Sequence, residues 1–286
     1  MIERRCFWIS ILACCFIGLS TFVILAGPKT TNPLMATPPL SQSLYFSFVG
    51  MNHAIQYRYG DWIVIDSETV ENTTIVLDGN LIIEPSGSLT LTNVTLLVEQ
   101  KPQDMYKLMA KPGSSLNISN STIVSSQTDY RFLFIVNGAN FVIKNSKLEG
   151  LGRPSEFGYS PGGGLLIYNT DGAILEDNTI NHHESYGISI TNSNNITLKN
   201  NTITCTGPDE TSGAINLDNS HNNTITYNHL YRQWDAIHLQ SSWNNYIAYN
   251  ELTLTNHTIG ISVWHGSGNN IIEYNNISAH EGYNMV

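Results

Sequence analysis

Charged side chains are scarce in this sequence. Asp, Glu, Lys and Arg together make up 13% of the residues, which is roughly half the usual share. Helical proteins cover their exposed faces with Glu, Lys, Arg and Ala, whereas Asn, Thr, Ser and Gly supply most of the polarity here. The composition therefore argues against helices and favours strands and turns. Hydrophobic residues reach 41%, so the chain is expected to fold.

Basic residues are scarcer still, with 13 Lys and Arg against 23 Asp and Glu and a formal net charge of -10. A nucleic-acid partner is not expected, because no basic stripe is present to displace phosphate counterions. The same acidity disfavours adsorption to anionic lipid. It suits cations or neutral sugars better than polyanionic substrates.

Cysteine is nearly absent from most of the chain. Cys6, Cys14 and Cys15 lie close to the N-terminus, and Cys205 stands alone beyond them. If the N-terminal segment is a targeting sequence, no intrachain disulfide can form in the remainder. Stability must then come from packing.

The N-terminal segment has the features of a membrane signal. An uncharged apolar run extends from Cys6 to Ala26 and follows Arg4 and Arg5. As a helix it would reach about 30 Å, enough to span a bilayer, and the two arginines would keep the N-terminus inside. We expect a signal anchor, with a signal peptide cleaved at Ala26–Gly27 as the alternative. Either segment places the remainder on the extracytoplasmic side.

The rest of the chain divides into an expected linker at 27–43, rich in Pro, Thr and Ser, an N-terminal cap region at 44–71, and a repeat domain at 72–286. In the repeat domain, similar units begin about every two dozen residues. They start at Gly164, Gly187, Gly213, Ala236 and Gly260. Each unit opens with apolar residues in alternation, such as Ile188 and Ile190, which predicts a strand. A polar turn, a second short strand and an Asn-x-Ile/Leu element follow.

The Asn-x-Ile/Leu element aligns one asparagine per unit. The aligned residues are Asn178, Asn201, Asn228, Asn250 and Asn275. Three short strands per coil, with parallel stacking, would superimpose like positions, so that these amides form hydrogen-bonded ladders. Weaker copies of the pattern reach back to Asn93. The sequence therefore predicts an all-β, right-handed, single-stranded parallel β-helix of about eight rungs after one N-terminal transmembrane helix, with a possible starting turn near Thr74–Glu84.

The repeated Asn-Asn-x-Ile-x-x-Asn-x-Ile motif, which ends in Leu at Asn222–Leu230 and Asn244–Leu252, resembles the right-handed β-helix superfamily with the pectin-lyase-like fold. Within it, the chain is most similar to NosD-type periplasmic copper-binding repeats and to carbohydrate-binding and sugar-hydrolase repeats. The resemblance covers about Asn72 to Asn276. It implies the fold but leaves the activity open, because the superfamily includes lyases, hydrolases, epimerases, adhesins and metal-delivery proteins.

In that superfamily, ligand clefts tend to lie along the outer face of the first strand. Two outward columns are predicted there: Leu166, Ser189, Asn216, His238 and Ser262, and Tyr168, Thr191, Asp218, Gln240 and Trp264. For a carbohydrate ligand, Asp218 and His238 are candidates for an acid/base pair, and Arg232 for binding a carboxylate or stabilising an enolate. The candidate sugar-binding residues are Tyr168, Trp234, Asp235, Gln240 and Trp264. The polygalacturonase, pectate-lyase and epimerase motifs of the superfamily have no match.

Metal binding is the alternative function. His182, His183, His238 and His257 are predicted to fall on the same side of the coil, with carboxylates beside them. Imidazole suits copper-type metals, and calcium is a further possibility, but no spacing fixes a coordination geometry. A non-catalytic scaffold or adhesin is the third reading. The sequence indicates neither a cofactor nor an oligomeric state. The end of the chain, Gly282–Val286, resembles a first strand cut short, so further rungs are expected beyond Val286.

Overall fold

Short strands in which buried and exposed residues alternate make up most of the described chain. The computed structural model describes residues 43–46, 54–100, 106–127, 130–152, 164–181, 186–204 and 213–279, without the side chains of 43–46, 232–234, 255–258 and 279. In β6 (Ser88–Val98), for example, Leu89, Leu91, Leu96 and Val98 are buried and their neighbours are not. This period of two is the geometry of a strand with one face on a core.

The remaining strands are β1 (Ser43–Phe46), β2 (Ala54–Tyr59), β3 (Trp62–Val64), β4 (Ser67–Asp78), β5 (Leu81–Ile83), β7 (Lys107–Ala110), β8 (Ser115–Ser119), β9 (Thr122–Ser125), β10 (Leu133–Asn137), β11 (Asn140–Lys144), β12 (Lys147–Glu149), β13 (Leu165–Tyr168), β14 (Ile174–Glu176), β15 (Thr179–Asn181), β16 (Tyr186–Thr191), β17 (Thr197–Lys199), β18 (Thr202–Thr204), β19 (Gly213–Asp218), β20 (Thr224–Thr226), β21 (His229–Gln240), β22 (Tyr246–Ala248), β23 (Glu251–Trp264), β24 (Ile271–Glu273) and β25 (Asn276–Ala279). No helix is among the elements of the described ranges, so none there could span a bilayer. The predicted anchor at 1–26 lies outside these ranges.

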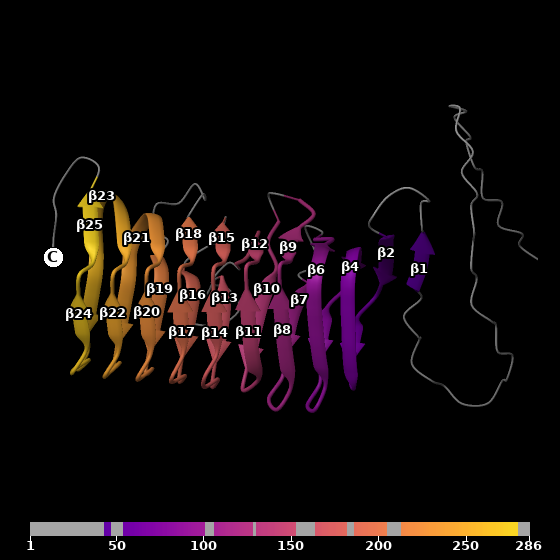
Figure 1. Cartoon of the computed structure of the whole chain (residues 1–286), viewed down its shortest axis with the longest axis horizontal. Helices are drawn as coiled ribbons and strands as arrows, with labels where there is room; N and C mark the ends of the chain where they lie inside the picture. Colours follow the sequence, from indigo (N-terminus) through magenta and orange to yellow (C-terminus); the bar gives the residue numbers. More distant parts are fainter. Residues whose placement is uncertain are drawn as a thin grey trace, which may run out of the picture.

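The strands stack into parallel columns along one axis (Figure 1). First strands run β3–β5–β7–β10–β13–β16–β19 and continue into the second halves of β21 and β23. Second strands run from β8 through β11, β14, β17, β20 and β22 to β24. The predicted all-β parallel solenoid is confirmed, with about seven turns where the sequence predicts about eight.

The N-terminal region departs from this regular stacking. β1 and β2, which lie within or beside the predicted cap region 44–71, form an antiparallel pair. Parallel pairing begins with β2, β3 and β4, ahead of Asn72. The Arg58 guanidinium of β2 lies 3.8 Å from the centroid of the Trp62 ring in β3, and both side chains donate to Glu68 in β4, at 2.7 and 2.9 Å. This network ties the first strands together.

Aliphatic side chains from successive rungs fill the interior. The expected inward residues of the first strands, Ile188, Ile190, Ile215, Leu217, Ile237 and Leu239, are fully buried. Burial of each such side chain contributes about 1.5–3 kcal/mol. At the last described rung, Val263 and Ile272 occupy inward register positions but are 45% and 40% exposed, because no described rung covers them. The expected strand at Gly282–Val286 lies outside the described ranges.

The predicted asparagine ladder is present inside the coil. Asn178 Nδ2 donates to Asn201 Oδ1 at 2.9 Å, and the same bond joins Asn201 to Asn228 at 3.0 Å. It continues from Asn228 to Asn250 at 3.0 Å and on to Asn275 at 2.9 Å. Each carboxamide oxygen also accepts the main-chain N–H of the preceding ladder asparagine. Buried polar groups are thereby satisfied by the next rung.

Two further ladders were not predicted. Asn223, Asn245 and Asn270 repeat the carboxamide arrangement, and the hydroxyls of Ser193, Ser220, Ser242 and Ser267 accept N–H groups from the rung before. In the early rungs, Ser121 and Ser146 take the ladder position. This explains why the sequence pattern fades toward the N-terminus.

A second column occupies the corner immediately before the ladder, where every residue has a positive φ between 49° and 58°. This left-handed column consists of Asn72, Asn93, Asn120, Asn145, Asp177, Asn200, Tyr227, Tyr249 and Tyr274. Asn and Asp tolerate that conformation, whereas other residues with a Cβ incur a cost of about 1–2 kcal/mol each. The tyrosines stack at centroid distances of 5.1 Å. Two stacked pairs contribute about 0.5–1.5 kcal/mol each, less than the cost for three residues.

Replacing Asn228 with Ala should destabilise the coil. The change removes the acceptor of the Asn201 N–H and a donor to the Leu198 carbonyl, both buried. We expect the free energy of unfolding to fall by about 3 kcal/mol, measured by urea unfolding of the full chain followed by circular dichroism. Lys199→Ala, at an exposed position of the preceding rung, is the control and should change it by less than about 0.5 kcal/mol. Equal midpoints for the two variants would contradict the ladder's role.

Candidate functional site

The outer face of the first-strand sheet carries both predicted columns in register. Leu166, Ser189, Asn216, His238 and Ser262 are successive partners in one column, and Tyr168, Thr191, Asp218, Gln240 and Trp264 in the other. The column prediction is therefore confirmed. Strand alternation turns these side chains outward because their neighbours point into the core.

This face changes character along its length. Toward the N-terminus it is apolar, with Ile135, Leu133 and Leu166 forming a small cluster against which Met109 packs. From Ser189 onward the same column is polar. The polar half therefore provides hydrogen-bonding groups on a rigid sheet, the setting in which binding sites are built.

Three polar side chains meet where β21 and β23 continue the column of first strands. Ser262 Oγ lies 2.7 Å from His238 Nδ1 and donates to Asp235 Oδ2 at 3.3 Å. The distance from His238 Nδ1 to Asp235 Oδ2 is 3.6 Å. The side chains of His238 and Asp235 are only 12% and 13% exposed. Oδ1 of Asp235 is buried and has no partner among the described groups.

One arrangement of hydrogens satisfies all three groups. If the Ser262 hydroxyl donates to Asp235, it accepts from the Nδ1–H of His238. In the neutral ring, Nε2 is then an acceptor. In this arrangement, which we call the Asp235–Ser262–His238 relay, the two polar side chains orient the His238 ring and leave Nε2 able to take a proton.

Tyr186 forms a wall of this site, and a glycine makes room for it. Its ring centroid lies 6.3 Å from that of His238. A Cβ on Gly213 would come within 2.2 Å of the Tyr186 ring and 2.8 Å of the Asp235 carbonyl oxygen. Burial, and secondarily the negative charge of Asp235, raises the pKa of Tyr186 to about 12. The phenol therefore stays protonated and can act as a donor.

Trp264 supplies an exposed aromatic surface on the other side of His238. The two ring centroids are 5.6 Å apart in an edge arrangement, and Trp264 is 52% exposed. Its exposed ring suits stacking on an apolar ligand face. The site therefore combines a buried relay, a protonated phenol and an open aromatic platform.

The structure brings together only part of the predicted sugar site. Asp235, His238 and Trp264 meet, whereas the carboxylate beside His238 is Asp235 and not Asp218, which pairs in register with Gln240. Gln240 borders the site as the register partner of Trp264. Tyr168 lies in the same column, four rungs away from Trp264 and thus at about 19 Å.

The other predicted residues cannot be placed at this site. His182 and His183 lie outside the described ranges, as do the side chains of Arg232, Trp234 and His257 within β21 and β23. Among the side chains that are described, no three His, Cys, Asp or Glu residues come together as metal ligands. Copper-type or calcium binding stays a prediction.

Sequence reasoning missed Tyr186 and the role of Ser262. Tyr186 directly precedes Gly187, the residue at which the predicted unit begins, whereas β16 begins at Tyr186 itself. One signal was available: the unit start that follows is Gly213, and any other residue type there would bring a Cβ into the space of the Tyr186 ring. Ser262 was placed in its column, but its contact with Asp235 depends on side-chain directions that periodicity does not provide.

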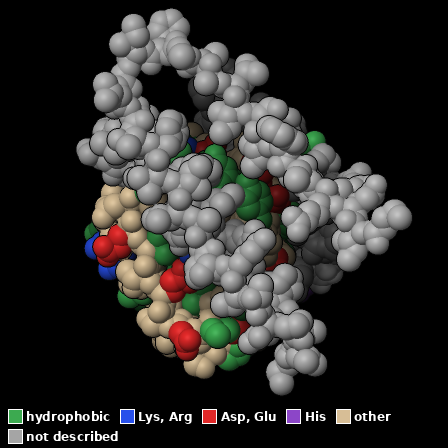
Figure 2. Space-filling model, turned by 90° about the vertical axis from the view of Figure 1, so that its right-hand side faces the viewer, with side chains coloured by type: hydrophobic (Ala, Val, Ile, Leu, Met, Phe, Trp, Pro, Cys, Tyr) green, Lys and Arg blue, Asp and Glu red, His purple; other side chains and the backbone are tan. Residues whose placement is uncertain are grey.

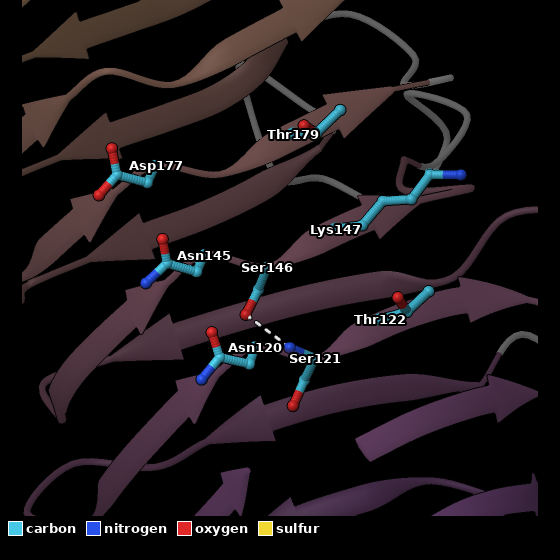
Figure 3. A pocket seen from close by; sticks show the side chains of 8 residues that line it. All are labelled: Asn120, Ser121, Thr122, Asn145, Ser146, Lys147, Asp177 and Thr179. Atoms are coloured by element: carbon cyan, nitrogen blue, oxygen red, sulfur yellow. Dashed lines mark hydrogen bonds between the residues drawn. The ribbon is translucent and has the colours of Figure 1, made fainter. Parts of the chain in front are cut away.

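A separate shallow hollow lies at another corner of the coil. Asn120, Ser121, Thr122, Asn145, Ser146, Lys147, Asp177 and Thr179 line it. In Figure 3, the side chains of Asn120, Asn145 and Asp177 extend on one side, in successive rungs.

From the N-terminal end, Figure 2 shows acidic side chains around the described rim, with basic ones only beside them, in keeping with the net charge of -10.

Comparison with known proteins agrees with this architecture. The model of the right handed beta helix region matches residues 79–207 and 133–285, most of the chain. The chain belongs to the right-handed β-helix family. No curated protein matches the chain.

Among solved structures, this β-helix is similar to a double mutant of the periplasmic alginate epimerase AlgG, with 13% identity, a TM-score of 0.47, and coverage of 81% of this chain and 78% of that one. The A-module of the mannuronan C-5 epimerase AlgE6 of Azotobacter vinelandii shares 9% identity over 79% of this chain and 90% of its own, with a TM-score of 0.37. Identities and scores this low transfer no activity to this chain.

Tyr186 should titrate with a pKa raised to about 12. We expect Asp235→Asn to lower its pKa but to leave it above 10, because burial is the larger cause of the shift. The measurement is the alkaline absorbance titration of the full chain, with the curve of Tyr186→Phe subtracted. Asp218→Asn is the matched control and should leave the value unchanged. Ionisation of Tyr186 near pH 10 would show that the ring is not held as described.

Proposed function

We propose that this chain is an exported β-helix protein that binds and processes carbohydrate on the outer face of its first strands, around His238. The predicted segment at 1–26 would hold it at the membrane. The observation that supports this function best is the buried relay from Asp235 through Ser262 to His238, directly beside the exposed ring of Trp264. A site that processes carbohydrate needs an aromatic surface on which the sugar stacks and a group that transfers a proton. The exposed ring and the relay would supply these two.

Binding would rest on Trp264 and the polar columns. A sugar ring presents C–H groups on its faces and hydroxyls at its rim. Its face can stack on Trp264 while its hydroxyls reach the exposed side chain of Gln240, the register partner of Trp264. Asn216 is buried and donates to Ser189 Oγ at 3.4 Å, so it supports the face without contacting the sugar.

Chemistry would rest on His238 and Tyr186. In hydrolysis of a glycosidic bond, Nε2 of His238 would accept the proton of the water that attacks the sugar carbon, and Asp235 would stabilise the imidazolium through Ser262. The Tyr186 phenol, with its pKa raised to about 12, would donate a hydrogen bond to the departing oxygen, which leaves as a hydroxyl once it is protonated. A proton acceptor and a hydrogen-bond donor thus border one site.

The charge of the site favours sugars without carboxylates. Among the described side chains, Asp235 and Asp218 are the charged groups in and beside these columns, and no Lys or Arg lies in either column. A uronate would face this negative charge in a partly buried site, where repulsion is weakly screened. The proposed substrate class is therefore a neutral oligosaccharide.

Binding and turnover can be separated by two substitutions. Trp264→Ala should weaken binding of neutral oligosaccharides on a glycan array by about tenfold or more. His238→Gln should retain binding but slow conversion of the bound glycan by about 10²- to 10⁴-fold, followed by product analysis. Trp243→Ala removes another exposed tryptophan, 46% accessible, and is the matched control. Unchanged binding by Trp264→Ala would refute the site, and a wild-type chain that converts no glycan would refute processing.

A further inference from the structure

A row of exposed tyrosines occupies the corner between the second and third strands. Tyr227, Tyr249 and Tyr274 stack in successive rungs with nearly parallel rings, and they are 49%, 43% and 70% exposed. None of the three phenol hydroxyls forms a hydrogen bond with a described group. The tyrosine row therefore presents ring edges and a line of unpaired hydroxyls to solvent.

The row places tyrosines in a backbone conformation that Asn or Asp adopts at lower cost. Its φ values are 58°, 58° and 53°, in the left-handed region that disfavours a residue as large as Tyr. All six described rungs before it fill the same position with Asn or Asp, which adopt this conformation easily. Strain of this kind is concentrated at functional sites, and stacking offsets only part of it. The row therefore calls for a role besides folding.

We propose that the tyrosine row is a second carbohydrate-binding surface, distinct from the face around His238, which takes a neutral, extended oligosaccharide aligned with the coil axis. The hydroxyls donate and accept, and so match the hydroxyls of sugar units, while the face of Tyr274 turned away from Tyr249 can pack on sugar C–H groups. Because the row repeats with each rung, it offers the same groups at a constant interval. An extended polymer of similar units can contact several of them at once.

The flanks of the row favour a neutral glycan over the alternatives. Glu251 pairs with His229 at 2.9 Å on one side, and Glu273 accepts from the Tyr246 hydroxyl at 3.1 Å on the other. A polyanion would meet these carboxylates. A protein partner would need about 800 Å² on each side with an uncharged centre, whereas this row is one side chain wide and bordered by charge.

The same corner continues as a polar strip toward the N-terminus. Asn200 donates to Asp177 at 2.6 Å, and beyond them lies the hollow lined by Asn120 and Asn145 (Figure 3). The carboxamides of those two asparagines make no hydrogen bond to a described group. From Asn120 to Tyr274 the strip spans about 30 Å, room for several sugar units.

The test is the triple substitution Tyr227→Asn, Tyr249→Asn and Tyr274→Asn in the full chain. Asn is the residue that earlier rungs use at this position, so the variant should fold, and its thermal midpoint should not fall. We expect binding of an immobilised panel of neutral oligosaccharides to weaken by about tenfold or more, also in the Trp264→Ala background. Tyr249→Phe, which keeps the ring and loses the hydroxyl, should weaken it severalfold even if the triple variant is unstable.

The outcomes separate the two surfaces. Residual binding by Trp264→Ala that the triple substitution removes supports the tyrosine row, whereas loss of all binding by Trp264→Ala alone overturns it and leaves the face around His238 standing. Loss of binding by the triple variant, with no effect of Trp264→Ala, supports the tyrosine row and overturns the face around His238. A triple variant that is destabilised while Tyr249→Phe binds like wild type overturns the proposal, because the row is then structural. Absence of binding to every neutral glycan, or a change only in self-association by sedimentation, also overturns it.

Discussion

Hydrogen bonding along the coil axis between identical side chains is the constraint on which this structure depends. An asparagine at the third-strand corner is buried, so its carboxamide must find partners, and the equivalent asparagine of the next rung provides them. Once these groups are in register, the strands before and after them are in register too. The outward columns are therefore aligned because the inward ladders are.

Periodicity was sufficient to predict what repeats. The inward residues Ile215 and Leu217, the ladder through Asn201, and the outward columns through His238 all follow from superimposing units of similar sequence. The structure corrects one detail of that alignment. The three early copies of the pattern, Asn93, Asn120 and Asn145, lie in the left-handed column. In the rungs of Asn120 and Asn145, the ladder position belongs to the serine that follows.

What does not repeat could not be predicted in this way. Asp235 and Tyr186 lie where one rung passes into the next, and these segments differ in length from rung to rung, so alignment gave no position for their side chains. The sequence selected Asp218 as the partner of His238 because it is one rung away in the repeat. The structure gives that place to Asp235, three residues before His238 in the same strand.

The carboxamide ladder also has a direction. From Asn178 to Asn250, every carboxamide donates one N–H to the carboxamide oxygen of the next rung and another to a main-chain carbonyl of the rung before. Every ladder oxygen accepts from the rung before. A buried N–H in one rung is thus completed only when the following rung is in place. During synthesis, N-terminal rungs emerge first. Each new rung then supplies the acceptors for buried N–H groups of the rung before it, so the coil can add rungs in order from the N-terminus to the C-terminus.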